Sequence, residues 1–299
     1  MNVRKTFIII FLIVLSGFSL RGQSTLFETH NKDISHAHAI FGDDYYYGER
    51  RLDNAFVSVV YRKTFVWDTL GFKRCSTEDI LLVGQTWTKY QDIIKYQYDT
   101  GIKEDLRGTE RKLLRAISYN TYWAGFYDVL LFNRPQNETV FTCRMGAEDY
   151  QVTEKAPSLN WALTDSTRRF GSYLCQQATT VFGGRLWYAW FTSEVPIPVG
   201  PWKLGGLPGL IVFAYDDSRQ YEFEALSVSN EEVPINKISY PYRPITRKQY
   251  NRMIREMMEE YYTFVNSHLA GSGVVRIGEI GVKHPKETMR FSVIERNEE

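Results

Sequence analysis

Three charged side chains near one predicted strand have the residue types needed for acid–base chemistry. Arg185, Glu194 and Lys203 supply one carboxylate and two cations within a short stretch of chain. Together they could transfer protons in a hydrolase or anchor an anionic ligand. Arg185 and Glu194 also lie at opposite ends of one strand-like segment, where they could simply form cross-strand ion pairs. Both readings stay open, and no catalytic residue is assigned.

A second group with chemical potential is the histidine-rich N-terminal segment. His36 and His38 lie on the same side of an extended segment, and His30 precedes them. Imidazoles in this arrangement could bind copper or zinc, although a polar N-terminal arm without metal is the favoured interpretation. The sequence contains no GxSxG, HExxH, P-loop or GxGxxG motif, and we therefore expect no cofactor.

The densest pattern is an aromatic strand followed by a Gly/Pro loop. In residues 185–194, RLWYAWFTSE, strand alternation places aromatic rings on both faces. Residues 195–209, VPIPVGPWKLGGLPG, then exclude regular structure, and Pro208-Gly209 suits the centre of a type II turn. Such an ordered loop is either functional or a rigid structural crossover between strands. The candidate binding residues are Arg185, Trp190, Glu194, Trp202, Lys203, Gly206, Leu207, Pro208 and Gly209.

This region carries a family resemblance. Residues 206–211 read GLPGLI, and the chain resembles the bacterial GLPGLI family, with similarity concentrated between residues 161 and 228. Gly183 departs from the family pattern, where arginine is usual. The resemblance implies an exported, β-rich protein of Gram-negative envelopes without an established activity. It also implies an accessory role near an outer-membrane receptor-type protein, which is an association and not a mechanism.

The cysteines allow at most one disulfide. Cys75, Cys143 and Cys175 are the three cysteines, and Cys143 and Cys175 both lie in strand-like segments. A Cys143–Cys175 disulfide is therefore one prediction for an oxidising compartment. The alternative is that all three are small buried hydrophobic residues.

The elements around these residues indicate a mainly β (α+β) protein. Many strand-like segments separated by turns predict an open antiparallel sheet or half-barrel. Residues 109–124 show helical spacing, and a long C-terminal helix is expected from about Arg247 to His268, with its apolar stripe covering one face of the sheet. A last strand at residues 290–295 is possible. We expect one domain at residues 54–299, preceded by an N-terminal extension at residues 23–53.

The first 22 residues are typical of a signal peptide. Arg4 and Lys5 precede an apolar run from Phe7 to Leu15, which is too short to span a bilayer. No cysteine stands just after this run, so a lipoprotein is not expected. No later segment predicts a transmembrane span. We therefore expect an exported protein that is periplasmic, associated with the outer membrane, or secreted.

The charge balance excludes nucleic acid as a partner. The whole chain has a formal net charge of +1, and loss of Arg4, Lys5 and Arg21 with the signal peptide lowers this to about −2. The favoured function is a non-enzymatic binding or accessory protein with an aromatic-lined groove for a lipid, a peptide or a segment of a partner. The alternatives are a hydrolase that uses the Arg185, Glu194 and Lys203 region, and metal binding by the N-terminal histidines.

Overall fold

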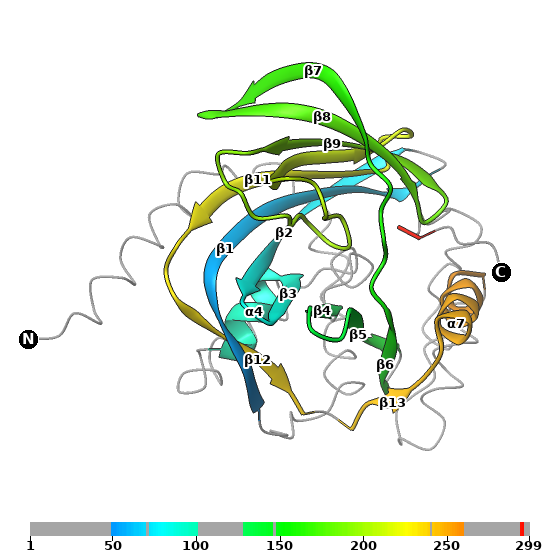
Figure 1. The fold of residues 1–299 in the computed structure, drawn as a ribbon. Helices are drawn as coiled ribbons and strands as arrows, with labels where there is room; N and C mark the ends of the chain where they lie inside the picture. Colours follow the sequence, from blue (N-terminus) through cyan, green and yellow to red (C-terminus); the bar gives the residue numbers. More distant parts are fainter. Residues whose placement is uncertain are drawn as a thin grey trace, which may run out of the picture. The chain divides into compact units, whose positions relative to one another are not determined.

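One large β-sheet dominates the computed structural model (Figure 1). The structure describes residues 49–69, 72–100, 128–145, 148–239, 241–259 and 294–295. The strands are β1 (Glu49–Asp68), β2 (Lys73–Gly84), β3 (Trp87–Asp92), β4 (Val129–Asn133), β5 (Glu138–Met145), β6 (Glu148–Lys155), β7 (Ala162–Phe170), β8 (Tyr173–Phe182), β9 (Arg185–Thr192), β10 (Leu210–Asp216), β11 (Tyr221–Ser229), β12 (Val233–Ile238) and β13 (Arg243–Pro244). The helices in these ranges are α4 (Ile93–Thr100) and α7 (Arg247–Glu259).

The sheet is almost entirely antiparallel. Its strand order is β13-β6-β5-β4-β3-β2-β1-β11-β10-β9-β8-β7, and β12 pairs with β1 beside this path. Only the two-residue strand β13 pairs in parallel, with β6. The long strand β1 is central because its β-branched and aromatic residues pair with β2 over one half and with β11 and β12 on the other side.

The two faces of the sheet have separate cores. The inner face is defined by Val59, Tyr61, Leu81, Trp187 and Phe223, and loop 195–209 adds Leu204 and Leu207 to this core. The outer face carries two smaller clusters. One, at β2 to β5, includes Ile80, Leu82 and Leu131 and packs against residues of α4 and β12. The other, at β8 to β10, includes Cys175, Trp190 and Val212.

The β8–β9 hairpin explains the departure at Gly183. Gly183 and Gly184 are the only residues between the two strands, and their φ angles are 61° and 69°. A two-residue turn with positive φ at both positions matches the twist of a hairpin, and glycine adopts it without strain. Arginine at position 183 would cost conformational energy in this turn.

The predicted long C-terminal helix over one face of the sheet is wrong. The helix α7 has 13 residues and contacts the sheet at its first turns, where Tyr250 packs edge-on against Phe141 and Arg247 pairs with Glu154. Loop 195–209 covers one end of the inner face instead, where Leu204 and Leu207 join the core of Trp187 and Phe223. Residues 260–268 of the predicted helix lie outside the described residues.

The boundary of the N-terminal extension differs from the prediction, and several other predicted segments lie outside the described residues. β1 begins at Glu49, so residues 49–53, which were assigned to an N-terminal extension, are part of the sheet. The signal peptide, the helix at 109–124 and residues 290–293 lie outside the described residues. Neither described helix is long and apolar enough to cross a bilayer.

Candidate functional site

Arg185 is a structural residue in the core. Its Nη1 atom lies 2.6 Å from Oδ2 of Asp216, and both side chains are fully buried. Its Nε donates to the carbonyl oxygen of Ile294 at 2.9 Å, and its guanidinium lies over the ring of Tyr221. Gln220 accepts further hydrogen bonds from the two terminal nitrogens. These contacts occupy the guanidinium and hold the start of β9 against the β10–β11 turn.

Glu194 and Lys203 bind partners other than those of Arg185, although Arg185 and Lys203 contact the consecutive residues Ile294 and Glu295. Oε1 of Glu194 accepts a hydrogen bond from the backbone N–H of Leu174 at 2.8 Å. Nζ of Lys203 lies 2.9 Å from Glu154 and 2.6 Å from Glu295. The three predicted acid–base residues are therefore engaged in separate interactions, and the hydrolase that would use them is not supported.

The GLPGLI loop connects the neighbouring antiparallel strands β9 and β10. Its backbone is tied by bonds from Gly206 N–H to the Pro198 oxygen at 3.0 Å and from Leu210 N–H to the Val195 oxygen at 2.9 Å. Nε1 of Trp161 donates to the oxygen of Gly205 at 2.8 Å. Lys203 reaches Glu154 on β6, so the loop connects the β9–β10 side of the sheet to the β6 side. This geometry favours the structural reading of the loop.

The other predicted binding residues divide between buried and exposed positions. Leu207 and Gly209 are buried, whereas Gly206 and Pro208 are exposed. Trp202 packs against Trp187 at 5.7 Å between ring centroids. A bond from Gly209 N–H to the Leu207 oxygen at 2.7 Å closes a three-residue turn at Pro208, so the predicted type II turn is wrong.

Aromatic rings do lie on both faces of β9. Trp187 and Phe191 belong to the inner core, whereas Trp190 is on the outer face. There, Trp190 lies 5.6 Å from Phe170, and the rings of Tyr188 and Tyr215 stack at 5.1 Å, measured between centroids. The stacked rings cover one another's faces, so they stabilise the pairing of β9 with β10.

The predicted disulfide is wrong, because Cys75, Cys143 and Cys175 are free thiols. Cys175 belongs to the outer-face cluster of Trp190. Cys143 on β5 is the register partner of Tyr150 on β6, and both side chains lie on the inner face. Burial raises the pKa of Cys175 to about 11, as is typical of an inert core thiol.

A charged cluster that the sequence analysis missed lies on the inner face. Asp79 on β2 is the register partner of Asp92 on β3, and Asp128 directly precedes β4 next to Asp92. Nζ of Lys63 on β1 lies 3.0 Å from Oδ2 of Asp79, and the Tyr90 hydroxyl donates to the same oxygen at 2.5 Å. We call these five residues the acidic cluster.

Burial determines the electrostatics of the acidic cluster. It raises the pKa of Asp128 to about 6, against the opposing effect of Lys63 and Arg247. It also lowers the pKa of Lys63, but the carboxylates of Asp79, Asp92 and Asp128 outweigh this effect and hold the pKa above its usual value. The Lys63 ammonium therefore stays charged, while Asp128 exchanges its proton near neutral pH.

One signal in the sequence could have revealed this cluster. The alternating core positions of β1 are Val57, Val59 and Tyr61, and the next residue in the series is Lys63. Asp79 precedes Leu81 and Val83 in the same way on β2. A charge at a core position of an alternating strand is costly unless it is paired, so these positions indicate partners across the sheet.

The pKa of Asp128 predicts a pH-dependent effect of Asp128→Asn. Because the folded pKa lies above the ordinary value of 3.8, the folded protein holds more protons than the unfolded chain between about pH 4 and 6, and its stability falls as the pH rises. Asparagine stays neutral. From pH 4 to pH 7.5, urea unfolding should show the variant gaining on the order of 2 kcal/mol relative to the wild type. A constant difference across this range would contradict the assignment.

The described residues contain no group of three or more His, Cys, Asp or Glu side chains arranged to hold a metal ion. Within the acidic cluster, Lys63 and Tyr90 bind Asp79, and the carboxylate of Asp92 accepts from the backbone N–H of Lys95. His30, His36 and His38 lie outside the described residues, so the N-terminal metal site stays a prediction.

The fold and the site define a mainly β protein with a buried acidic cluster on one face of a large sheet. No family model and no curated protein matches the chain. Among solved structures it is similar to PNGF-II in the P21 crystal form, with a TM-score of 0.46 and 15% identity over 69% of this chain and 34% of that chain. PNGF-II in the C2 form gives a TM-score of 0.44 with the same identity and coverage. The chain thus spans about a third of the PNGF-II chain. Because both TM-scores are below 0.5, no function is inferred from this similarity.

Proposed function

We propose that the chain is an exported envelope protein of the GLPGLI family that binds a ligand without transforming it, and that the acidic cluster receives a positively charged group of this ligand. The signal-like N-terminus and the resemblance support the location and the family. An accessory role beside an outer-membrane receptor-type protein belongs to the same proposal. The ligand class follows from the contacts of Asp79.

The main support for a ligand at the acidic cluster is Asp79, because one of its two carboxylate oxygens has no partner within the described residues. The side chain is 1% exposed, and Lys63 and Tyr90 both bind Oδ2. Within the described ranges, Oδ1 has no hydrogen-bond partner. A buried acceptor without a donor is costly, and it is most often satisfied by water or by a ligand. A donor group on a ligand would satisfy it.

The surroundings favour a cationic donor over a neutral one. The carboxylates of Asp92 and Asp128 act on the same ammonium of Lys63 as Asp79 does, so the site attracts positive charge. Tyr90 contacts Asp79 directly, burial and the charge of Asp128 raise the pKa of Tyr250, and the Tyr250 ring packs against Phe141. Carboxylates beside aromatic rings suit an organic ammonium group, which gains both ion pairing and cation–π contact.

A matched pair of small probes tests the ligand class. Putrescine carries ammonium groups, and 1,4-butanediol has the same length with neutral hydroxyl groups. Isothermal titration calorimetry at pH 7.5 should detect binding of putrescine and no binding of butanediol. Asp128→Asn should weaken putrescine binding at least about 10-fold, because it removes a carboxylate that is charged at this pH.

Asp165→Asn is the control, since Asp165 lies on the exposed strand β7 and its loss should leave the affinity unchanged. Equal binding of the two probes, or unchanged affinity in Asp128→Asn, would contradict the assigned ligand class. Location is tested separately by cell fractionation and N-terminal sequencing, which should find the chain outside the cytoplasm and beginning near residue 23.

A further inference from the structure

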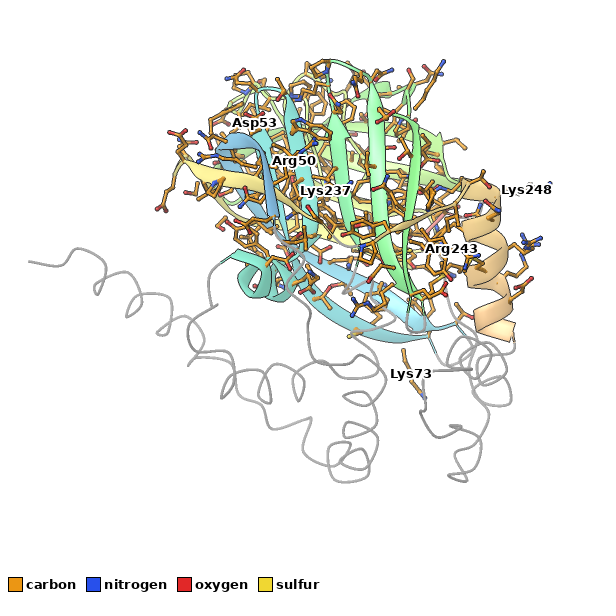
Figure 2. All side chains as sticks on the ribbon, turned by 90° about the horizontal axis from the view of Figure 1, so that it is seen from below. Arg50, Asp53, Lys73, Lys237, Arg243 and Lys248 are labelled. Carbon is orange, nitrogen blue, oxygen red and sulfur yellow. The ribbon has the colours of Figure 1, made fainter. Side chains whose placement is uncertain are left out.

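We propose that Arg50 and Lys237 form a second binding site, which takes a phosphate-type oxyanion. The two residues are direct register partners in the antiparallel pair of β1 and β12. Figure 2 shows them close together, with Arg243 and Lys248 farther along toward α7. Like charges directly opposite each other destabilise a sheet, so this pair calls for a compensating anion.

Nearby acids do not supply that compensation. In the described part of the chain, the Arg50 guanidinium has neither an ion pair nor a hydrogen bond, and no carboxylate lies within ion-pair distance of Lys237. Asp53, farther along β1, accepts hydrogen bonds from the backbone N–H groups of Thr86 and Trp87. Oε1 of Glu49 accepts from Asn236. Among the described residues, the carboxylates of Asp53 and Glu49 therefore leave the positive charge of the pair without a compensating ion pair.

The ammonium of Lys237 is held in place by uncharged groups. Its Nζ donates to Oε1 of Gln151 at 2.7 Å and lies 5.5 Å from the ring centroid of Tyr242. Nε2 of Gln151 donates to Thr153, which fixes the amide with its oxygen toward the lysine. A half-buried ammonium in a fixed position pays little entropy when it binds, in contrast to a mobile surface lysine.

The geometry of the pair favours phosphate over a single carboxylate. The guanidinium of Arg50 offers a planar fork of donors, and Lys237 has ammonium protons beyond the one that Gln151 accepts. Several oxygens on one tetrahedral centre can accept from both cations at once. Burial and the charge of Arg50 lower the pKa of Lys237 in the free protein, and a bound oxyanion would raise it.

NMR of the full chain with labelled lysine side chains tests this site with inorganic phosphate as the probe. Phosphate should raise the pKa of Lys237, and Arg50→Gln should reduce phosphate affinity at least about 10-fold. Arg50→Gln should also raise the pKa of Lys237 without phosphate, because it removes the repulsion between the two cations. The second effect shows that the variant is folded and that the two residues interact.

Arg243→Gln is the matched control, since Arg243 is exposed and already paired with Glu148. It should leave phosphate affinity unchanged. If Arg243→Gln lost as much phosphate affinity as Arg50→Gln, the binding would come from diffuse positive charge and not from a defined site. Vesicles of phosphatidylcholine with and without phosphatidic acid distinguish the sources of the oxyanion. Binding of free phosphate indicates a soluble ligand, and binding only to vesicles with phosphatidic acid indicates a lipid headgroup. Binding to neither overturns the proposal.

Discussion

Arg185→Met is expected to destabilise the protein by about 3–5 kcal/mol, which is enough to prevent folding of many domains. The change leaves the carboxylate of Asp216 buried without its cation. Asp216 would keep its bond from the backbone N–H of Tyr221 at 2.7 Å, but the charge-assisted bond from Arg185 at 2.6 Å would be lost. Urea unfolding followed by tryptophan fluorescence measures the effect, because Trp187 lies on the same strand.

Two further variants separate this explanation from a general loss of charge. Arg62→Gln breaks the exposed pair with Glu224 and should cost less than about 1 kcal/mol. The double variant with Arg185→Met and Asp216→Leu should recover much of the stability, because it removes both buried charges. If Arg185→Met were as mild as Arg62→Gln, the pair would not be a structural centre of the β9–β11 region.

The sequence permitted a good prediction of local elements. Residues 210–215, LIVFAY, form a short apolar run that predicts a strand, and the structure has β10 there. At the start of α7, Thr246 and Gln249 have the residue types of a capping box and form one, with a bond from Gln249 N–H to Thr246 Oγ1 at 3.2 Å and one from Thr246 N–H to Gln249 Oε1 at 2.8 Å. Both features depend on neighbouring residues, which is why sequence periodicity detects them.

Long-range pairing was beyond the same reasoning. Whether Arg185 meets Glu194, Lys203 or Asp216 depends on which strands become neighbours, and β10 brings Asp216 to β9. Either loop 195–209 or a helix could cover the inner face. The outcome depends on how well the side-chain volume of each segment fills the space above the sheet, which the spacing of apolar residues in the sequence does not measure. Asp79 and Asp92 become a cluster only when β2 and β3 are paired in register.

Those contacts also explain how the two ends of the inner face differ. At one end, loop 195–209 fills the space with Leu204 and Leu207, and Lys203 fastens it to β6. At the other, Lys63 and three carboxylates replace the apolar side chains. Lys203 fastens the loop, and with it the strands β9 and β10, to β6. The acidic cluster lies apart from the loop, on β1 to β3 and directly before β4.

Gly209→Ala tests that role of the loop and should be severely destabilising. The φ angle of Gly209 is 158°, and a Cβ atom placed there would lie 2.0 Å from the carbonyl oxygen of Thr192. The obstacle is backbone of β9, which cannot move without disturbing its pairing with β10. We expect a loss of about 3 kcal/mol or more in the free energy of unfolding, measured by urea denaturation.

Gly171→Ala provides the matched comparison, because Gly171 has a φ of 56° and no atom within 4 Å of the added Cβ. That variant should cost only about 1 to 2 kcal/mol, from backbone strain alone. The difference between the two variants measures the close approach of loop and strand at Gly209. Equal costs would mean that the loop shifts freely on β9, and it would then be unable to hold Lys203 against Glu154.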